Sequence, residues 1–324
     1  MNLPTHTTDL GHGIFAIDTG FEREDFDAAY LIVDTGRAAF IDTGHNAAVP
    51  RLLEALDAIG LPREAVDWVI PTHVHLDHAG GAGLLMRHLP GARALIHPRG
   101  ARHLIDPSAL VEGARAVYGV EVVRQTYGTI EPIEAARVVE SHDGQRIPLG
   151  SRELLLIDTP GHARHHHCIW DERSRGWFTG DTFGISYREF DGADGAWIFP
   201  STTPVQFEPE ALRSSVQRMM AMQPQCLYPT HFGRVDGVER LAAQFLATLD
   251  RFEADGLALL ARLPDDAPAR LAALKEQVAA TLVASALAAG CPVSPARAHE
   301  LLALDIELNA QGMAVWLSRI GRTP

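Results

Sequence analysis

The segment THVHLDHAG, residues 72–80, decides which fold this chain adopts and where its functional site lies. It places three imidazoles and one carboxylate within six residues, in the pattern H-x-H-x-D-H: His73, His75, Asp77 and His78. Side chains of these types are the preferred ligands of zinc and of similar borderline metals. Their directions diverge over so short a stretch, so one ion does not readily take all four. The segment therefore predicts a site for two neighbouring metal ions.

The segment lies in a predicted loop between a strand and a helix. Residues 66–70 are rich in β-branched and aromatic side chains, which predicts a largely buried strand that ends at Pro71. After the motif, a glycine-rich stretch leads into residues 84–89, whose pattern is typical of a helix. Loops between such rigid elements often carry function. A lone histidine is more often packed than metal-bound, but four candidate ligands at this spacing favour metal binding.

Three further strand-like segments each end in a candidate ligand. The ligands and the segments that precede them are His162 after residues 154–157, Asp181 after residues 176–178, and His231 after residues 226–228. This repetition predicts one sheet edge that converges on one site. Ligands so widely dispersed need a folded domain to bring them together, which favours a catalytic centre over a small structural metal site.

With these positions identified, the chain resembles the metallo-β-lactamase-fold hydrolase superfamily. The motif and the three later positions occur in the order that this family has. The resemblance implies an α/β fold, a four-layer αββα sandwich with the metals at one edge. It also implies the ligands and their support: His73, His75 and His162 for one metal, Asp77, His78 and His231 for the second, Asp181 as the bridge, and Asp42 as a residue that supports the ligands from behind.

The resemblance and the donor chemistry agree on a mechanism. Two divalent ions about 3.5–4 Å apart can share a water and lower its pKa toward neutrality. The resulting hydroxide is the expected nucleophile, and Asp77 is the expected catalytic residue that orients it. One ion would polarise a carbonyl or phosphoryl oxygen while the other stabilises the developing anion. We expect two divalent ions, zinc first, with manganese and iron as alternatives because a His/Asp set suits all three.

The run RHHHC, residues 164–168, resembles a second metal site. From about residue 166 the chain is expected to enter another strand, in which alternate side chains face opposite sides. We therefore expect one of His165, His166 and His167 to hydrogen-bond a ligand and the others to pack. None of the three is expected to bind metal directly.

Composition restricts the class of protein. Of 324 residues, 46% are hydrophobic and 21% are charged, as in soluble globular proteins. The net charge of −13 argues against nucleic acid, because tracking phosphates requires a basic face. We identify no apolar run of membrane-spanning length, no leader segment, and only three scattered cysteines. We expect a cytoplasmic protein that acts on a small molecule, without nucleic-acid or membrane partners, and with a homodimer as an open alternative.

The chain is predicted to divide at residue 237. Residues 1–237 mix strand-like and helical patterns and form the predicted catalytic domain. Residues 238–324 are rich in Ala and Leu at helical spacing, which predicts a domain of three or four helices, one of them capped by Ser294. Residues 98–139 are predicted to be largely helical, and either cover the mouth of the site or pack as surface helices.

An irregular segment at residues 183–207 follows Asp181 and is a candidate substrate loop. Within it, Tyr187 and Arg188 are candidate substrate contacts, and Trp197 and Phe199 are candidate pocket residues. An aromatic side chain in a loop is more often a packing anchor than a substrate contact, so packing is the alternative role for these aromatic residues.

The ligand set defines a mechanism and leaves the substrate open. The C-terminal extension is similar to that of glyoxalase II, a glutathione thioesterase. The basic residues that hold glutathione in that family include lysines, however, and Lys275 is the only lysine here. Lactonases, phosphodiesterases, arylsulfatase-like enzymes and nucleases share the ligands. We expect hydrolysis of a small ester, thioester or lactone, with a phosphodiesterase as an alternative.

Two other classes are similar enough to be considered. A persulfide dioxygenase-like oxidoreductase would use one iron, and metal content with oxygen uptake would separate it from a hydrolase. Diiron flavoproteins replace one motif histidine by Glu, whereas this chain has His75 there. A non-catalytic metabolite sensor would be expected to have lost ligands, and this chain keeps all seven.

Overall fold

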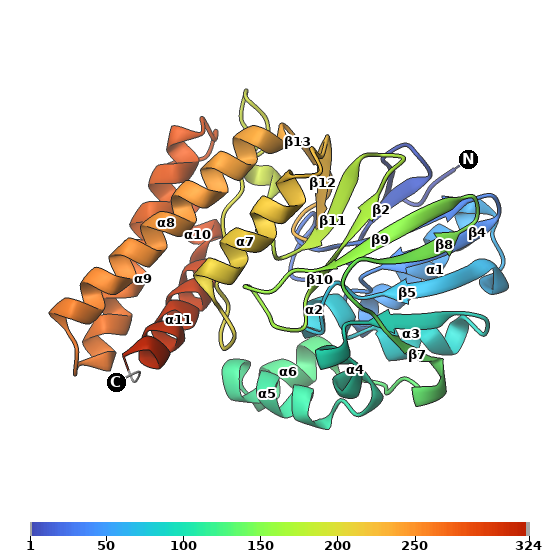
Figure 1. The fold of residues 1–324 in the computed structure, drawn as a ribbon, viewed down its shortest axis with the longest axis horizontal. Helices are drawn as coiled ribbons and strands as arrows, with labels where there is room; N and C mark the ends of the chain where they lie inside the picture. The colour runs from blue at the N-terminus through green and yellow to red at the C-terminus, as the bar shows by residue number, and fades with distance from the viewer. Residues whose placement is uncertain (1, 322–324) are drawn as a thin grey trace. The chain divides into compact units, whose positions relative to one another are not determined.

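The computed structural model describes residues 2–321, which form two compact units (Figure 1). The first unit contains the chain up to residue 158, together with residues 165–180 and 225–234. The second contains residues 159–164, residues 181–224, and the chain from residue 235 onward. The chain therefore alternates between the units. The predicted division into successive domains at residue 237 stays a prediction.

A seven-stranded sheet forms one layer of the first unit. Its strands, in spatial order, are β1 (Thr7–Asp9), β2 (Ile14–Asp18), β3 (Ala28–Asp34), β4 (Arg37–Ile41), β5 (Val66–Ile70), β6 (Arg93–Ile96) and β7 (Val138–Glu140). Strands β1 to β4 are antiparallel and β4 to β7 are parallel. The turn between β3 and β4 has two residues, Thr35 and Gly36, both with positive φ, as the twist of a tight hairpin requires.

A second sheet forms the next layer. Within the first unit its spatial order is β12 (Cys226–Pro229), β11 (Gly176–Gly180), β10 (His167–Asp171), β9 (Arg152–Asp158) and β8 (Gln145–Leu149). The two sheets bury a shared apolar core that includes Ile32, Ile41, Leu156, Ile169 and Phe178. The predicted single sheet edge is confirmed for the three later ligands, because β9, β11 and β12 belong to the second sheet and run in the same direction. Strand β5, which precedes the motif, belongs to the first sheet. Stacking two sheets aligns strand ends that no single sheet holds.

Helices cover the other face of the first sheet. They are α1 (Val49–Ile59), α2 (Leu76–Ala79), α3 (Ala82–His88), α4 (Pro98–Ile105), α5 (Ser108–Tyr118) and α6 (Val120–Tyr127), with short 3-10 turns η1 (Asn46–Ala48), η2 (Arg63–Ala65) and η3 (Ala135–Arg137). Apolar side chains of α1, α3 and α4 pack against β2 to β6 in one core. Helix α5 buries no side chain, so the predicted helical interval is confirmed but its outer part lies on the surface.

The second unit is mainly helical. It contains η4 (Arg188–Phe190), α7 (Pro209–Met220), β13 (Val235–Asp236), α8 (Val238–Arg262), α9 (Ala267–Ala288), α10 (Pro295–Leu301) and α11 (Ala303–Ile320). Between residue 237 and residue 321, where the described part ends, there are four helices, within the range predicted. The Ser294 side chain accepts a hydrogen bond from the backbone N–H of Arg297, so the predicted cap of α10 is confirmed.

Helix α9 is long and apolar enough to cross a membrane, judged by its length and composition alone. Its most apolar window has a mean hydropathy of 1.3, and 22% of that window is buried. By this test the expectation that no run reaches membrane-spanning length is wrong. A core helix passes the same test, and the buried residues Leu274, Val278 and Leu282 lie on one stripe of α9. The absence of a membrane partner stays a prediction.

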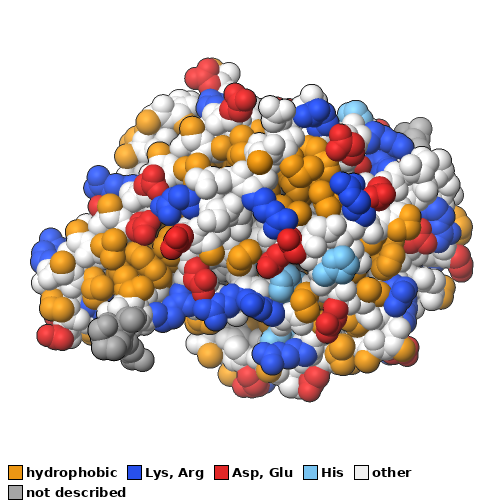
Figure 2. All heavy atoms as spheres, in the orientation of Figure 1, with side chains coloured by type: hydrophobic (Ala, Val, Ile, Leu, Met, Phe, Trp, Pro, Cys, Tyr) orange, Lys and Arg blue, Asp and Glu red, His pale blue; other side chains and the backbone are white. Residues whose placement is uncertain are grey.

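Charges of both signs share the surface. Figure 2 shows acidic and basic side chains interspersed with apolar ones on the face that it draws. The chain carries 41 acidic and 28 basic residues, so neutralisation between neighbours leaves an acidic excess.

Candidate metal centre

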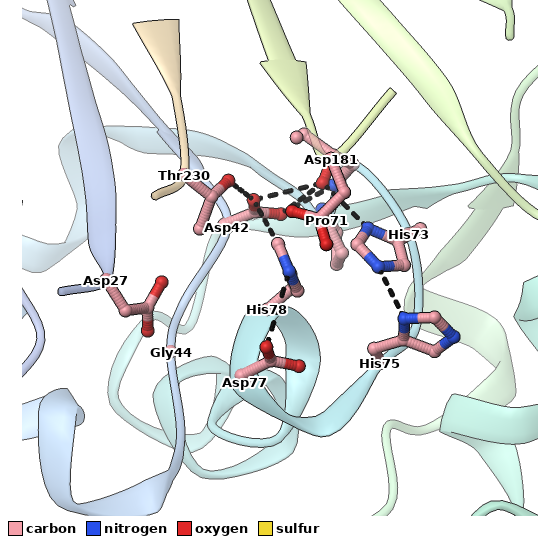
Figure 3. A network of polar contacts seen from close by, with 12 residues as sticks. Asp27, Asp42, Gly44, Pro71, His73, His75, Asp77, His78, Asp181 and Thr230 are labelled. Carbon is pink, nitrogen blue, oxygen red and sulfur yellow. Dashed lines mark hydrogen bonds and ion pairs between the residues drawn. The ribbon is translucent and has the colours of Figure 1, made fainter. Parts of the chain in front are cut away.

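Asp42 joins the motif to two other strands. It follows β4 in a left-handed conformation, with φ of 54°, and its side chain is 1% exposed. Its Oδ1 accepts the backbone N–H of Thr72 at 2.6 Å, and its Oδ2 accepts the Thr230 hydroxyl at 2.7 Å. The His78 Nδ1–H donates to the same Oδ2 at 3.0 Å (Figure 3). One carboxylate thus fixes the start of the motif, the ring of His78 and the end of β12.

Asp77, His78 and His231 form a group that can hold one cation. The Nε2 atoms of His78 and His231 lie 3.6 Å and 3.5 Å from Asp77 Oδ2. Their candidate ligand atoms all lie within 4.8 Å of one another. The His231 Nδ1–H donates to the Phe26 carbonyl at 2.9 Å. Each imidazole therefore commits Nδ1 to an acceptor and keeps Nε2 for an ion, which is how metal-binding histidines are usually oriented.

His73 and His75 form a second group in the same unit. His73 Nε2 and His75 Nδ1 lie 2.8 Å apart, and the two ring centroids are 4.4 Å apart (Figure 3). His73 is buried, while His75 is half-buried. A proton or a cation can be shared between ring nitrogens at this distance. The local geometry therefore brings this pair together as the motif predicts.

His162 and Asp181 form a group in the second unit. His162 Nε2 lies 3.5 Å from Asp181 Oδ2, and the His162 Nδ1–H donates to the Ser201 carbonyl at 3.1 Å. Both side chains are buried. All seven predicted ligands therefore fall into three local groups, two in the first unit and one in the second. In the groups of His78 and His162 the imidazole nitrogens are oriented by acceptors and lie beside carboxylates, a donor chemistry that fits divalent metal ions.

The histidine run at residues 165–167 lies close to the motif, but His167 has no ring nitrogen left for a metal ion. The His167 Nε2–H donates to the Pro71 carbonyl at 2.9 Å, and His167 Nδ1 accepts the Ser141 hydroxyl at 2.8 Å. Burial, and secondarily the nearby His97, lowers the pKa of His167 to about 3, so the ring is neutral. His166 stacks on His73 with centroids 4.8 Å apart.

The four candidate substrate contacts lie in the second unit. The rings of Tyr187, Trp197 and Phe199 are buried. The Tyr187 hydroxyl donates to Asp305 at 3.1 Å, and the Trp197 indole N–H donates to Ser285 at 3.1 Å. Arg188 pairs with Asp191 at 3.2 Å. These contacts are those of packing anchors, and contact with substrate stays a prediction.

Asp27 is a residue at the site that the sequence analysis missed. It is fully buried, and its Oδ2 accepts the Thr19 hydroxyl at 2.8 Å. Within residues 2–321, Oδ1 has no hydrogen-bond partner. Burial raises the pKa of Asp27 to about 7, although the neighbouring His231 and His78 act to lower it. The available signal was weak: an acidic residue directly before an apolar strand.

An aromatic cluster next to Asp27 was also missed. Phe21 stacks on Tyr127 with centroids 5.8 Å apart and meets His45 edge-on at 5.3 Å. The Asn46 side chain donates to the carbonyls of Tyr127 and Thr129 at 3.1 Å and 2.7 Å. These hydrogen bonds hold the end of α6 beside η1, the turn that precedes α1. The contacts of Tyr127 join residues 81 or more positions apart, which local sequence patterns do not specify.

The family model for the metallo-beta-lactamase superfamily matches residues 12–231. Together with the fold and the grouped His and Asp side chains, this match defines the class: the chain belongs to the metallo-beta-lactamase superfamily, whose members are mostly metal-dependent hydrolases. The predicted family, the αββα fold class with C-terminal helices, and the enzyme class are confirmed.

Individual relatives agree with this class. The chain is 29% identical over 176 residues to the metallo-beta-lactamase fold-containing protein ST1585 of Sulfurisphaera tokodaii, a match that covers 53% of this chain and 62% of that protein. It is 27% identical over 250 residues to the acyl-coenzyme A thioesterase MBLAC2 of Gallus gallus, covering 72% of this chain and 82% of that protein. The solved structure of the metallo-beta-lactamase family protein TTHA1429 from Thermus thermophilus shares the fold, with a TM-score of 0.66 at 21% identity over 97% of this chain and 95% of that one.

Proposed function

We propose that this protein is a dinuclear metal-dependent hydrolase of a small carboxylic ester, thioester or lactone, with a thioester as the first candidate. The observation that carries the proposal is the group of Asp77, His78 and His231, whose nitrogen and oxygen donors converge within 4.8 Å. The similarity to a protein named an acyl-coenzyme A thioesterase supports a thioester substrate.

In this proposal each group of side chains has one task. His73, His75 and His162 would hold one ion, Asp77, His78 and His231 would hold the second, and Asp181 would be a ligand to both. Bound divalent ions would supply an activated water and electrophilic assistance to the scissile carbonyl. Asp77, which is 24% exposed, would orient that water by accepting a hydrogen bond from it. Asp42 would hold the His78 ring so that Nε2 faces the ion.

The remaining parts of the proposal concern the metal and the surroundings. We propose zinc as the native metal, a cytoplasmic location, and no nucleic-acid or membrane partner. The donor set supports zinc but suits manganese and iron as well. The acidic excess supports the absence of a nucleic-acid partner.

Metal content and hydrolysis, measured on the same preparation, test the proposal. Plasma mass spectrometry is expected to find about two ions per chain, and assays on a thioester, a lactone and a phosphodiester are expected to show turnover of one of the first two. Turnover of the phosphodiester alone would show that the enzyme is a phosphodiesterase and does not hydrolyse carboxylic esters, thioesters or lactones. A single iron with oxygen uptake and no hydrolysis would replace the hydrolase by a dioxygenase.

The bridging role is tested by Asp181→Ala. This variant is expected to lose binding of two metal ions and to lose activity, because the negative charge that holds the two cations together is gone. The hydrolysis rate is expected to fall by at least about 10³-fold. Circular dichroism should show an unchanged fold. Wild-type stoichiometry and turnover in Asp181→Ala would overturn the ligand assignment.

A further inference from the structure

The C-terminal helix α11 lies against the segment that supports the His162 ring. The backbone N–H of Thr202 donates to Asn309 Oδ1 at 2.6 Å. The Thr202 hydroxyl lies 2.8 Å from the same oxygen and donates to the Asn309 carbonyl at 2.9 Å. Thr202 is fully buried and Asn309 is 2% exposed. Two buried residues 107 positions apart in the sequence are thus joined by three short contacts.

A glycine on α11 makes this approach close. A Cβ atom on Gly312 would lie 1.4 Å from the Thr202 carbonyl oxygen, a separation that no side chain tolerates. Further along α11, Trp316 meets the Phe207 ring edge-on at 6.0 Å, and Arg319 donates to the Phe207 carbonyl. The helix therefore fixes residues 202–207 along much of its length.

The residue next to Thr202 contacts the candidate ligand. The carbonyl of Ser201 accepts the His162 Nδ1–H at 3.1 Å, and this bond leaves Nε2, 3.5 Å from Asp181, as the nitrogen that can face an ion. The backbone around His162 has other supports, because Ser215 donates to the Pro160 carbonyl at 2.7 Å and the Arg164 N–H donates to Gln206 at 2.7 Å. The Ser201 carbonyl thus orients the ring, while other contacts hold the loop.

From these contacts we propose that Asn309 is a positioning residue for the metal ion at His162, acting through Thr202 and the Ser201 carbonyl. The C-terminal helices would then form part of the metal site's support, in addition to packing against one another. The inference rests on the proposed function, since it takes His162 as a ligand. Outer hydrogen bonds of this kind typically change metal affinity about 10–100-fold when removed.

The test compares two variants that each remove one buried contact between α11 and the segment at residues 183–207. Asn309→Ala removes the bond that leads toward His162. Tyr187→Phe removes the hydrogen bond to Asp305, which lies on the same helix. Zinc affinity is measured by competition with a chelator, and the equivalent that His162→Ala abolishes identifies the ion concerned. Thermal melts of both variants report general loosening.

Asn309→Ala is expected to bind that equivalent at least about tenfold more weakly and the other equivalent as wild type does. Tyr187→Phe is expected to bind both within about threefold of wild type while its melting temperature falls. Unchanged affinity in Asn309→Ala, or equal weakening in both variants, would overturn the inference. If Asn309→Ala does not fold, Thr202→Val, which keeps the backbone bond to Asn309, replaces it and is expected to weaken the same equivalent selectively.

Failure of the proposed function would be recognised separately. A wild-type protein that binds fewer than two zinc ions would overturn the dinuclear proposal itself. A wild type with two ions and an Asn309→Ala variant that matches it would overturn only the role of α11.

Discussion

Two histidine-rich segments of the first unit lie near each other and differ in what their rings can do. Residues 73–78 follow β5 in a loop and a short helix, whereas residues 165–167 lead directly into β10. His78 engages the Asp42 carboxylate with Nδ1, so Nε2 remains for an ion. His167 engages both nitrogens, with Ser141 and the Pro71 carbonyl.

The hydrogen-bond partners of a histidine decide its role more than its position among other histidines does. A neutral imidazole has one N–H and one lone pair, and a ligand needs the lone pair for the metal. The carboxylate of Asp42 takes the N–H of His78 and leaves its lone pair for an ion. The lone pair of His167 instead accepts the hydrogen bond from the Ser141 hydroxyl, so this ring links the segments after two strands and has no lone pair left for a metal.

The largest expected effect comes from breaking the first segment. His78→Ala removes one donor from the group with Asp77 and His231, so the second ion should be lost and hydrolysis should fall by at least about 10³-fold. Metal analysis and initial rates on the substrate identified first would measure both. An unchanged metal content would show that His78 is a packed residue, and the contrast between the two segments would fail.

Asp42→Asn tests the acceptor that distinguishes the segments. An amide has one oxygen that accepts hydrogen bonds, whereas the carboxylate accepts from Thr72, Thr230 and His78 with two. The His78 ring therefore loses its fixed orientation. Metal affinity at the second position should fall about 10–100-fold. Chelator competition measures this change. Asp67→Asn, which removes one half-buried carboxylate from the same unit, is the matched charge control and should leave metal affinity unchanged.

The sequence predicted those parts of the site that local patterns encode. Residues 66–70 form β5 as predicted, and the motif occupies the loop and short helix that follow it. Strands also precede His162, Asp181 and His231 as predicted. Alternation, glycine and proline at strand ends, and ligand chemistry are all local signals.

The contacts that orient the rings could not be predicted in the same way. The acceptor of His231 is a backbone carbonyl 205 residues earlier, and every residue type has such a carbonyl. Asp27 and Tyr127 reach the site only through tertiary packing. Tyr187 and Trp197 were placed in a loop as predicted, but their burial depends on α9 and α11, whose positions no local pattern specifies.

His167→Ala tests the structural role of the second segment by its effect on the unfolding free energy. The variant leaves the Ser141 hydroxyl and the Pro71 carbonyl without their partner, which should cost about 1–3 kcal/mol of unfolding free energy while two ions still bind. The folded-state pKa of about 3 lies below the ordinary value of 6.5, so the neutral ring's contribution is complete above pH 6.5 and is lost as the pH falls toward 3. Denaturant melts across this range should show a steeper loss in wild type than in the variant.

The smallest effect is expected for His165→Ala. The His165 ring meets His75 edge-on at 5.4 Å, and its Nδ1 lies 3.5 Å from the backbone nitrogen of Val74, too far for a strong bond. We expect wild-type metal stoichiometry, zinc affinity within about threefold, and an unfolding free energy lower by no more than about 1 kcal/mol. Loss of one equivalent of metal would mean that the second segment supplies a ligand. In that case the engagement of both ring nitrogens in hydrogen bonds would be a property of His167 and not of the whole segment.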